Sequence, residues 1–237
     1  MEEKKLLVST LNQLNIPIED EQADALLSFM EILLEANKHI NLTSITEPED
    51  FILKHIVDSL IMLSKDYVKE GIKVLDLGTG GGFPGIPLKI LYPEIQITLV
   101  DSVGKKLKFI DDAARNLGIK VELVHERAEI LGKNKKYREK YDIVISRAVA
   151  NMQTLSELCL PLVKVDGLMI ASKGPKYNEE LDAAKNAMKI LGGQVKSIED
   201  CTIPIAELER HVIIIEKTNA TPAAYPRKPG MPNKNPL

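Results

Sequence analysis

The sequence predicts an α/β protein with a mostly parallel sheet and a helical extension at its N-terminus. Three observations support this fold class. The first 70 residues carry apolar residues at helical spacing, short apolar runs alternate with helix-like segments from Gly71 onward, and the first of these runs ends in clustered glycines. Alternating strands and helices are typical of βαβ units, in which helices cover both faces of a parallel sheet.

Residues 1–70 are expected to form the helical extension. Between residues 25 and 34 the apolar side chains recur every three or four positions, with charged residues between them, which makes one apolar stripe. A loop is expected at residues 41–44, and a second amphipathic segment follows at residues 51–60.

Residues 71–217 are expected to hold the sheet. Short apolar runs that end in a turn predict five strands, at residues 72–77, 95–100, 121–124, 143–145 and 168–171. A helix-like stretch at residues 179–191 precedes two more candidate strands, 194–198 and 211–215. Because no convincing helix separates these two, we expect them to pair as antiparallel neighbours at one edge of the sheet.

Residues 218–237 are expected to form an extended, basic C-terminal tail. The segment contains five Pro and three Lys or Arg but no acidic residue. Each Pro fixes φ and removes a backbone donor, so we expect neither a helix nor a central strand here.

The charge of the chain is unevenly distributed. The formal net charge of −3 argues against a protein that coats nucleic acid non-specifically. Residues 1–70 hold fourteen Asp or Glu against six Lys, a net charge of −8, which leaves +5 for residues 71–237. We therefore expect a polyanionic partner to contact the second part of the chain.

Composition favours a soluble, cytoplasmic monomer. Hydrophobic residues make up 44% and charged residues 27% of the 237 residues, as in ordinary globular proteins. The polar start is unlike a signal peptide, and no apolar run approaches the length that spans a membrane. Cys159 and Cys201 lack CxxC spacing, which excludes a disulfide scaffold and a cysteine zinc site, and we expect no metal.

The glycine-rich loop at residues 78–85 indicates a ligand site. Clustered glycines let the backbone approach a ligand at the carboxyl end of a parallel sheet. The spacing of Gly80, Gly82 and Gly85 matches the dinucleotide fingerprint, so an NAD-dependent oxidoreductase is one alternative. Asp76, just before the loop, would repel a pyrophosphate and attract a cationic ligand, which favours S-adenosylmethionine.

Acidic residues at the next strand ends are expected to hold the adenosine of this cofactor. Asp101, followed by Ser102, ends the second strand, where a carboxylate can accept both ribose hydroxyls. After the third strand, Ala128 offers a small side chain and Glu129 can accept from the adenine amino group. The alternatives are a capping role for Asp76 and Asp101 and an ordinary loop acid at Glu129.

Cations at the ends of later strands suggest a surface for phosphates. Arg147 ends the fourth strand and Lys173 the fifth, and we expect this catalytic pair to anchor a base or its phosphates. A structural ion pair is the alternative for Arg147. The residues expected to contact a polyanionic partner are all cationic: Lys173, Arg210, Arg227, Lys228 and Lys234.

The chemistry expected at this site needs no general base. No Asn-Pro-Pro-Tyr sequence follows the fourth strand, which disfavours methylation of an exocyclic amine, and both cysteines are expected to be inert. Guanine N7 carries a free lone pair, so in-line alignment of the reactants is the main requirement there. Alignment alone can supply about 7 kcal/mol or more in favourable cases.

Residues 76–88 carry the most specific motif, because the Gly-rich loop continues into Pro84-Gly85-Ile86-Pro87-Leu88. With the segments 41–44, 55–60, 101–106, 145–148 and 173–174, this motif resembles one family over residues 37–217. That family is the glucose-inhibited division protein B family (RsmG), the bacterial small-subunit ribosomal RNA guanine-N7 methyltransferases. The tail from Arg227 onward is also similar to that of many members.

The resemblance implies a Rossmann-like, seven-stranded class I S-adenosylmethionine-dependent methyltransferase. Its implied cofactor contacts are Gly78, Phe83, Ala128, Glu129 and Arg147. The implied target is a guanosine in the decoding-region loop of 16S ribosomal RNA, either naked or in a pre-assembled small subunit. His55 and Asp58, one helical turn apart, are implied to face the cofactor pocket, although a core role for His55 and local pairing of Asp58 stay open.

Two other functions remain as alternatives at this point. A small-molecule methyltransferase would share the cofactor site but would not need the basic tail or the paired cations. A non-catalytic protein that binds ribosomes would keep the fold without the reaction.

Overall fold

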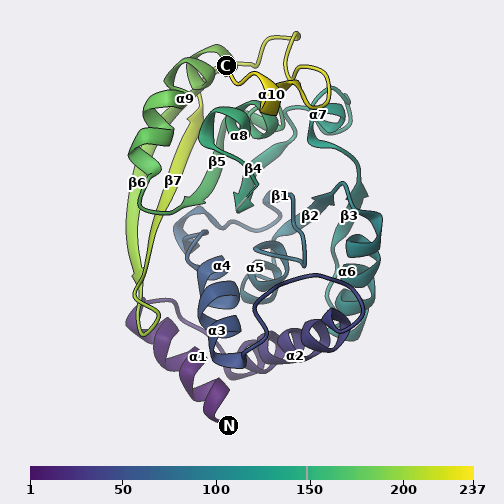
Figure 1. Ribbon diagram of the computed structural model, residues 1–237, viewed down its shortest axis with the longest axis vertical. Helices are drawn as coiled ribbons and strands as arrows, with labels where there is room; N and C mark the ends of the chain where they lie inside the picture. Colours follow the sequence, from purple (N-terminus) through teal and green to yellow (C-terminus); the bar gives the residue numbers. More distant parts are fainter. Residues whose placement is uncertain (148) are drawn as a thin grey trace.

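A computed structural model describes residues 1–147 and 149–237; residue 148, the end of the 145–148 motif, lies outside the described residues. The strands form a seven-stranded sheet in the order β3-β2-β1-β4-β5-β7-β6 (Figure 1). Their bounds are β1 Lys73–Leu77, β2 Gln96–Asp101, β3 Glu122–His125, β4 Tyr141–Arg147, β5 Val163–Lys173, β6 Gly193–Ile203 and β7 Leu208–Lys217. The predicted α/β class is confirmed.

Strand directions also follow the prediction. The strands β1 to β5 pair in parallel, whereas β7 is antiparallel to both β5 and β6. The chain returns directly from β6 to β7, so the last two strands are antiparallel neighbours and β6 forms the edge, as expected.

Helices cover both faces of the sheet (Figure 1). One face is covered by α1 Glu2–Gln13, α2 Asp20–Asn37, α3 Pro48–Phe51, the π-helix η1 Ile52–Val57, α4 Asp58–Leu60, α5 Gly85–Leu91 and α6 Gly104–Asn116. The other face carries α7 Ala128–Leu131, α8 Met152–Cys159, α9 Tyr177–Leu191 and α10 Met231–Lys234. A 3₁₀ turn, η2 Lys65–Tyr67, leads into β1.

The central strands are mostly buried because they supply two cores. Successive side chains of a strand point to opposite faces. Val74 and Ile143 pack with the helices α1 to α6, whereas Leu75 and Val144 pack with α8 and α9. Runs without polar alternation are therefore what a sheet covered on both faces requires.

The N-terminal helices share a core with the sheet. Leu26, Phe29 and Leu33 of the predicted stripe are fully buried in the same cluster as Val74. Burial of each such side chain contributes about 1.5–3 kcal/mol. Gln22, at the start of α2, donates to the carbonyls of residues 90 and 91 at the end of α5, which ties the two helices together.

The prediction of a wholly extended tail is wrong. Residues 218–237 fold back over α7 and α8, and they contain the short helix α10 (Figure 1). Pro232 stands in the first turn of α10, where a helix needs no N–H donor, so Pro does not prevent a helix at this position.

Within the described residues, no helix is both long and apolar enough to cross a membrane.

Candidate active site

The loop after β1, residues 78–85, has glycines where a side chain would not fit. Gly78 has a φ of +78°, and a Cβ on it would lie 2.5 Å from Val149 Cγ2. A Cβ on Gly85 would collide with Leu99 Cδ2, so α5 could not pack as closely on β2. The glycines therefore allow a tight turn at the carboxyl end of β1 and close packing of α5.

Asp76 lies beneath this loop instead of facing a ligand. Its side chain is fully buried, and Oδ2 accepts a hydrogen bond of 2.9 Å from the Gly85 N–H. Oδ1 is also buried and has no hydrogen-bond partner among the described residues. Burial raises the pKa of Asp76 to about 7. The prediction that Asp76 contacts a cationic ligand directly does not fit this burial. Its carboxyl group instead supports the loop through the hydrogen bond from Gly85.

A cavity of about 210 Å³ opens at the carboxyl ends of β1 and β2, and we call it the β1–β2 cavity. Asp101 and Ser102, the residues predicted to bind the ribose, line it. Asp101 Oδ2 accepts from the Gly80 N–H at 2.9 Å, and Oδ1 accepts from the Val103 N–H at 2.8 Å. A carboxylate has about four acceptor positions. Asp101 can therefore shape the two loops and still accept hydroxyl groups of a ligand.

The start of α7 forms the next wall of the β1–β2 cavity. Ala128 and Glu129 line it there. Glu129 is nearly buried, and its Oε1 accepts from Arg127 Nη2 at 3.1 Å and from the Gly230 N–H at 2.7 Å. Burial raises the pKa of Glu129, but the hydrogen bonds of Arg127 and Gly230 lower it more, so the group is an ionised acceptor.

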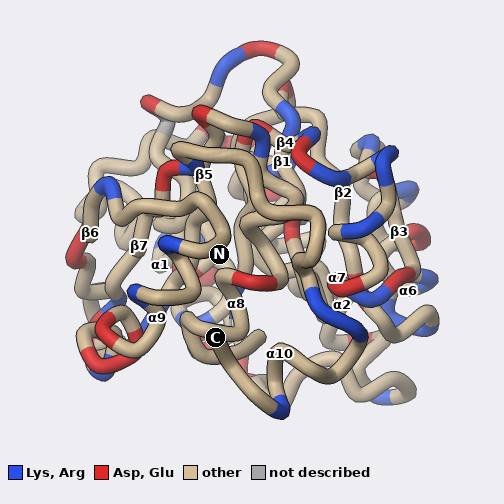
Figure 2. Tube along the Cα trace, turned by 90° about the horizontal axis from the view of Figure 1, so that it is seen from above, with Lys and Arg blue, Asp and Glu red and all other residues tan. Residues whose placement is uncertain are grey.

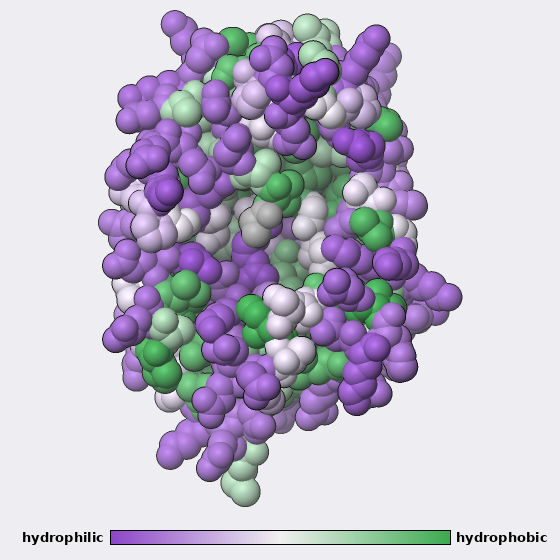
Figure 3. Space-filling view, viewed as in Figure 1, coloured by the Kyte–Doolittle hydropathy of each residue, from purple (hydrophilic) through white to green (hydrophobic). Residues whose placement is uncertain are grey.

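A second cavity, of about 390 Å³, lies at the carboxyl ends of β4 and β5, and we call it the β4–β5 cavity. Arg147 lines it, whereas Val149, two residues later, lines the β1–β2 cavity, so the two cavities adjoin. Lys173 and Arg210 also line the β4–β5 cavity. Figure 3 shows this face hollowed near its centre, with hydrophilic residues at the bottom of the hollow.

Asp58 joins two of these cations. Its Oδ2 accepts from Arg147 Nη1 at 2.9 Å, and its Oδ1 accepts from Arg210 Nε at 2.6 Å. The carboxylate is 3% exposed, and Arg147 is also mostly buried. Arg147 forms the structural ion pair that was its alternative role, and it also lines the β4–β5 cavity, so its contact with a base or phosphates stays a prediction.

His55 is an uncharged member of the same network and lies between Arg147 and Thr43. Arg147 Nη2 lies 3.1 Å from His55 Nδ1, and a guanidinium can only donate, so Nδ1 accepts. Nε2 therefore carries the proton and donates to Thr43 Oγ1 at 2.7 Å. Burial and the charge of Arg147 lower the pKa of His55 to about 4. The imidazole consequently stays uncharged at neutral pH.

Phe83 is enclosed by other aromatic rings. His55 stacks on Phe83, with ring centroids 4.6 Å apart and an interplanar angle of 13°, and Phe29 and Phe51 flank the same ring. Phe83 is 6% exposed and is not among the residues that line the β1–β2 cavity, so the cofactor contact that the resemblance implies for it stays a prediction.

Sequence reasoning missed the residues that shape the loop beside His55. Asn37 Oδ1 accepts from the N–H groups of Leu42 and Thr43, at 2.8 and 3.0 Å. Thr43 in turn holds His55. The one available signal was an Asn at the end of a predicted helix, a position where its side chain often bonds to nearby backbone.

The predicted cations are brought together only in part. Lys173 lines the β4–β5 cavity, but its ammonium lies 2.8 Å from Glu180 Oε2. Arg227 lies in the C-terminal segment and pairs with the buried carboxylate of Glu157. Lys228 and Lys234 are exposed in the same segment. Figure 2 shows basic and acidic positions interspersed along much of the chain.

Metal chemistry finds no support in the side-chain arrangement. Across residues 1–147 and 149–237, no group of three or more His, Cys, Asp or Glu side chains could hold a metal ion. Cys159 is fully buried, and this burial raises the pKa of its thiol, which favours the protonated form over the reactive thiolate.

Comparison of the chain with known proteins points to one family. Residues 22–213 match the family model GidB, described as rRNA small subunit methyltransferase G. A ribosomal RNA small subunit methyltransferase G from Alkaliphilus metalliredigens is 43% identical over 238 residues, which cover 100% of both chains. The protein of that name from Halalkalibacterium halodurans is 48% identical over 229 residues, or 96% of each chain.

Solved structures support the same fold at much lower identity. A methyltransferase from Pyrococcus furiosus superposes with a TM-score of 0.57 at 15% identity, over 83% of this chain and 100% of that chain. A ribosomal protein L11 methylase from Lactobacillus delbrueckii subsp. bulgaricus gives 0.53 at 17% identity, over 70% and 79%. The fold is therefore that of class I methyltransferases, and the full-length sequence relatives show that the chain belongs to the GidB family, rRNA small subunit methyltransferase G.

Proposed function

We propose that the protein transfers a methyl group from S-adenosylmethionine to N7 of a guanine in the decoding-region loop of 16S ribosomal RNA. The observation that carries the proposal is the pair of adjoining cavities at the carboxyl edge of the sheet. One is lined by acceptors suited to an adenosine, and the other by cations suited to phosphates. Relatives over the full length of the chain are named for methylation of small-subunit ribosomal RNA.

The residues of the β1–β2 cavity fit the cofactor. Asp101 and Ser102 would accept the ribose hydroxyls, while Ala128 and Glu129 would face the adenine. Gly78 lines this cavity, whereas the Gly80 N–H donates to Asp101 Oδ2 and so would help to orient that carboxylate toward the ligand. Asp76 and Phe83 would act indirectly. Asp76 holds the loop through the hydrogen bond from Gly85, and Phe83 stacks on His55. When bound, S-adenosylmethionine supplies an electrophilic methyl group.

The residues of the β4–β5 cavity would hold the acceptor base in line with that methyl group. Arg147 is fixed by Asp58 and His55, so its position costs little entropy when RNA binds. Lys173 and Arg210 would meet phosphates beside the base. The neutral His55 is not needed as a base, because N7 has a free lone pair.

Outer contacts to RNA would come from exposed cations. Lys228 and Lys234 are available for phosphates, whereas the Arg227 guanidinium is held by Glu157, so we leave it out of this set.

We further propose that the protein acts in the cytoplasm as a monomer, on naked RNA or on an assembled small subunit.

Methyl transfer can be tested directly. Purified protein is incubated with labelled S-adenosylmethionine and either deproteinised 16S ribosomal RNA or small subunits, and the labelled nucleotide is mapped. We expect N7-methylguanine at one position in the decoding-region loop. Label that enters only small metabolites would favour a small-molecule methyltransferase. Binding to the subunit without transfer of label would favour a non-catalytic role.

The ribose contact gives a separate prediction. Asp101→Ala should weaken binding of S-adenosylhomocysteine at least about tenfold, because hydrogen bonds to a charged acceptor are lost. Calorimetric titration measures the affinity. Asp111→Ala is the control, since Asp111 lies on α6, exposed and paired with Arg115. Equal affinities in Asp101→Ala and the wild type would contradict the assigned role of Asp101.

A further inference from the structure

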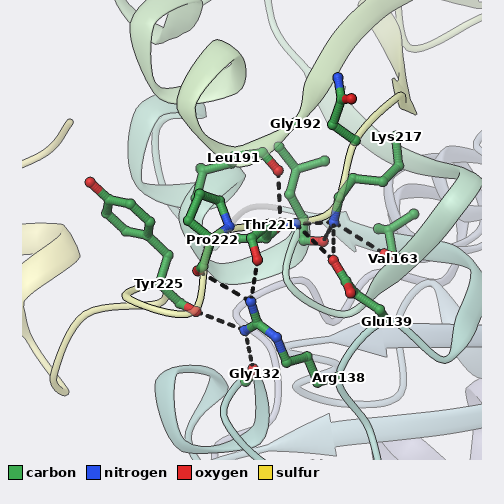
Figure 4. Close-up of polar contacts among 12 residues, drawn as sticks. Gly132, Arg138, Glu139, Val163, Leu191, Gly192, Lys217, Thr221, Pro222 and Tyr225 are labelled. Carbon is green, nitrogen blue, oxygen red and sulfur yellow. Dashed lines mark hydrogen bonds and ion pairs between the residues drawn. The ribbon is translucent and has the colours of Figure 1, made fainter.

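Residues 218–237, which we call the C-terminal strap, are fastened to the body of the protein at their start. The guanidinium of Arg138 donates to the carbonyls of Gly132, Thr221 and Tyr225, at 2.8, 2.6 and 2.7 Å (Figure 4). Lys217, which is fully buried, donates to Thr221 Oγ1 at 2.8 Å. The strap therefore leaves β7 in a defined direction.

A second anchor lies in the middle of the strap. Glu157 on α8 is 0% exposed, and it accepts from the backbone N–H of Arg227 at 2.8 Å and from its guanidinium at 2.6 Å. Farther along, Thr154 Oγ1 donates to the carbonyl of Pro232 at 3.1 Å. A buried carboxylate satisfied by one partner specifies a single position for that partner. These contacts fix the strap on α8.

Two residues of the strap, Gly230 and Asn233, reach the β1–β2 cavity or its wall. The Gly230 N–H donates to Glu129 Oε1 at 2.7 Å, so the strap supplies one of the two hydrogen bonds that this carboxylate accepts. Asn233 of α10 lines the cavity itself, as Asp101 and Ser102 do. The two anchors thus hold Asn233 at a cavity whose other lining residues lie between residues 77 and 158.

We propose that the C-terminal strap is part of the cofactor site, with Asn233 as a contact for the adenine and Gly230 as the residue that positions Glu129. The inference rests on the proposed function and deepens it. An amide offers both a donor and an acceptor, the pair that an adenine edge requires. The strap therefore serves cofactor binding first, and only its exposed lysines remain for RNA.

Affinity for S-adenosylhomocysteine tests the contact without any methyl transfer. Asn233→Ala should weaken binding about tenfold, as expected for the loss of hydrogen bonds in a ligand site. Asn233 is exposed, so its replacement should leave the melting temperature unchanged. Asn235→Ala is the matched control, because it changes the same residue type in the same strap outside the cavity. We expect the control to bind within twofold of the wild type.

Hydrogen exchange of the unmodified protein gives an independent readout. Amides of residues 227–237 should exchange more slowly when S-adenosylhomocysteine is added, whereas amides of α1 should not change. Wild-type protein that fails to bind S-adenosylhomocysteine would overturn the proposed function. If the wild type binds, then unchanged affinity in Asn233→Ala, or unchanged exchange in the strap, overturns this inference alone.

Discussion

Replacing Asp58 with Ala is expected to lower the free energy of unfolding by about 3 kcal/mol and to abolish methyl transfer to RNA. Asp58 is almost fully buried and divides its two oxygens between Arg147 and Arg210. Without it, two guanidinium groups face each other with no anion between them, and Arg147 is mostly buried. Removal of one member of a buried charge network is costly because the remaining charges lose both solvent and partner.

The loss of activity should exceed what instability explains. Arg147 would no longer be held at the β4–β5 cavity, so the RNA base would lose its anchor even in folded protein. The affinity for S-adenosylhomocysteine should change little, because Asp58 does not line the β1–β2 cavity. Chemical denaturation, calorimetric titration and transfer of label to RNA at a temperature where the variant is folded separate these effects.

The control for Asp58 is an aspartate in the same region that forms an exposed pair. Asp50 pairs with Lys54 one helical turn away, and both side chains are substantially exposed. Such pairs contribute about 0–1 kcal/mol, so Asp50→Ala should be close to neutral. An Asp58→Ala variant that is no less stable than Asp50→Ala would contradict the account of this network.

The sheet could be predicted because its determinants are local. Segments such as residues 72–77 and 95–100 are mostly apolar, and all but the first residue of the strand in each of them is buried, so their burial is visible as apolar residues close together in the sequence. The glycine loop was also predicted, since the close approach of α5 to β2 demands a residue without a side chain at Gly85. Because the strands are parallel, their carboxyl ends lie at one edge of the sheet, and this placed the candidate site residues together.

Contacts between distant residues could not be predicted in the same way. The partners of Asp58 lie 89 and 152 residues farther along the chain, and no local pattern identifies them. The strap looked extended because Pro dominates it, but its path is set by Arg138 and Glu157, which belong to other elements. Asp76 was assigned to the ligand from its position before the loop, whereas its burial depends on how α5 packs above it.

Asp76→Asn is expected to stabilise the protein at pH 8 by about 2 kcal/mol. Burial raises the pKa of Asp76 in the folded state to about 7, from its ordinary value of 3.8. The folded state therefore binds more protons than the unfolded state between about pH 4 and pH 7. Its stability falls as pH rises through this window, and the full cost of the buried charge is present above pH 7. A shift of this size corresponds to roughly 4 kcal/mol, which sets an upper limit.

The amide removes this cost because it has no charge, and its oxygen can still accept from the Gly85 N–H. At pH 4, where the wild-type carboxyl is protonated in the folded state, the variant should have no advantage. Urea denaturation at both pH values measures the difference. For Asp142→Asn we expect the opposite change in stability. Burial raises the pKa of Asp142, but Lys164 and the Lys73 N–H lower it more, so the ionised carboxylate is favourable in the folded state. This variant should therefore lose stability at pH 8. If Asp76→Asn instead were the less stable protein at pH 8, the Asp76 carboxylate would be a favourable charge, and its place beneath the glycine loop would need another explanation.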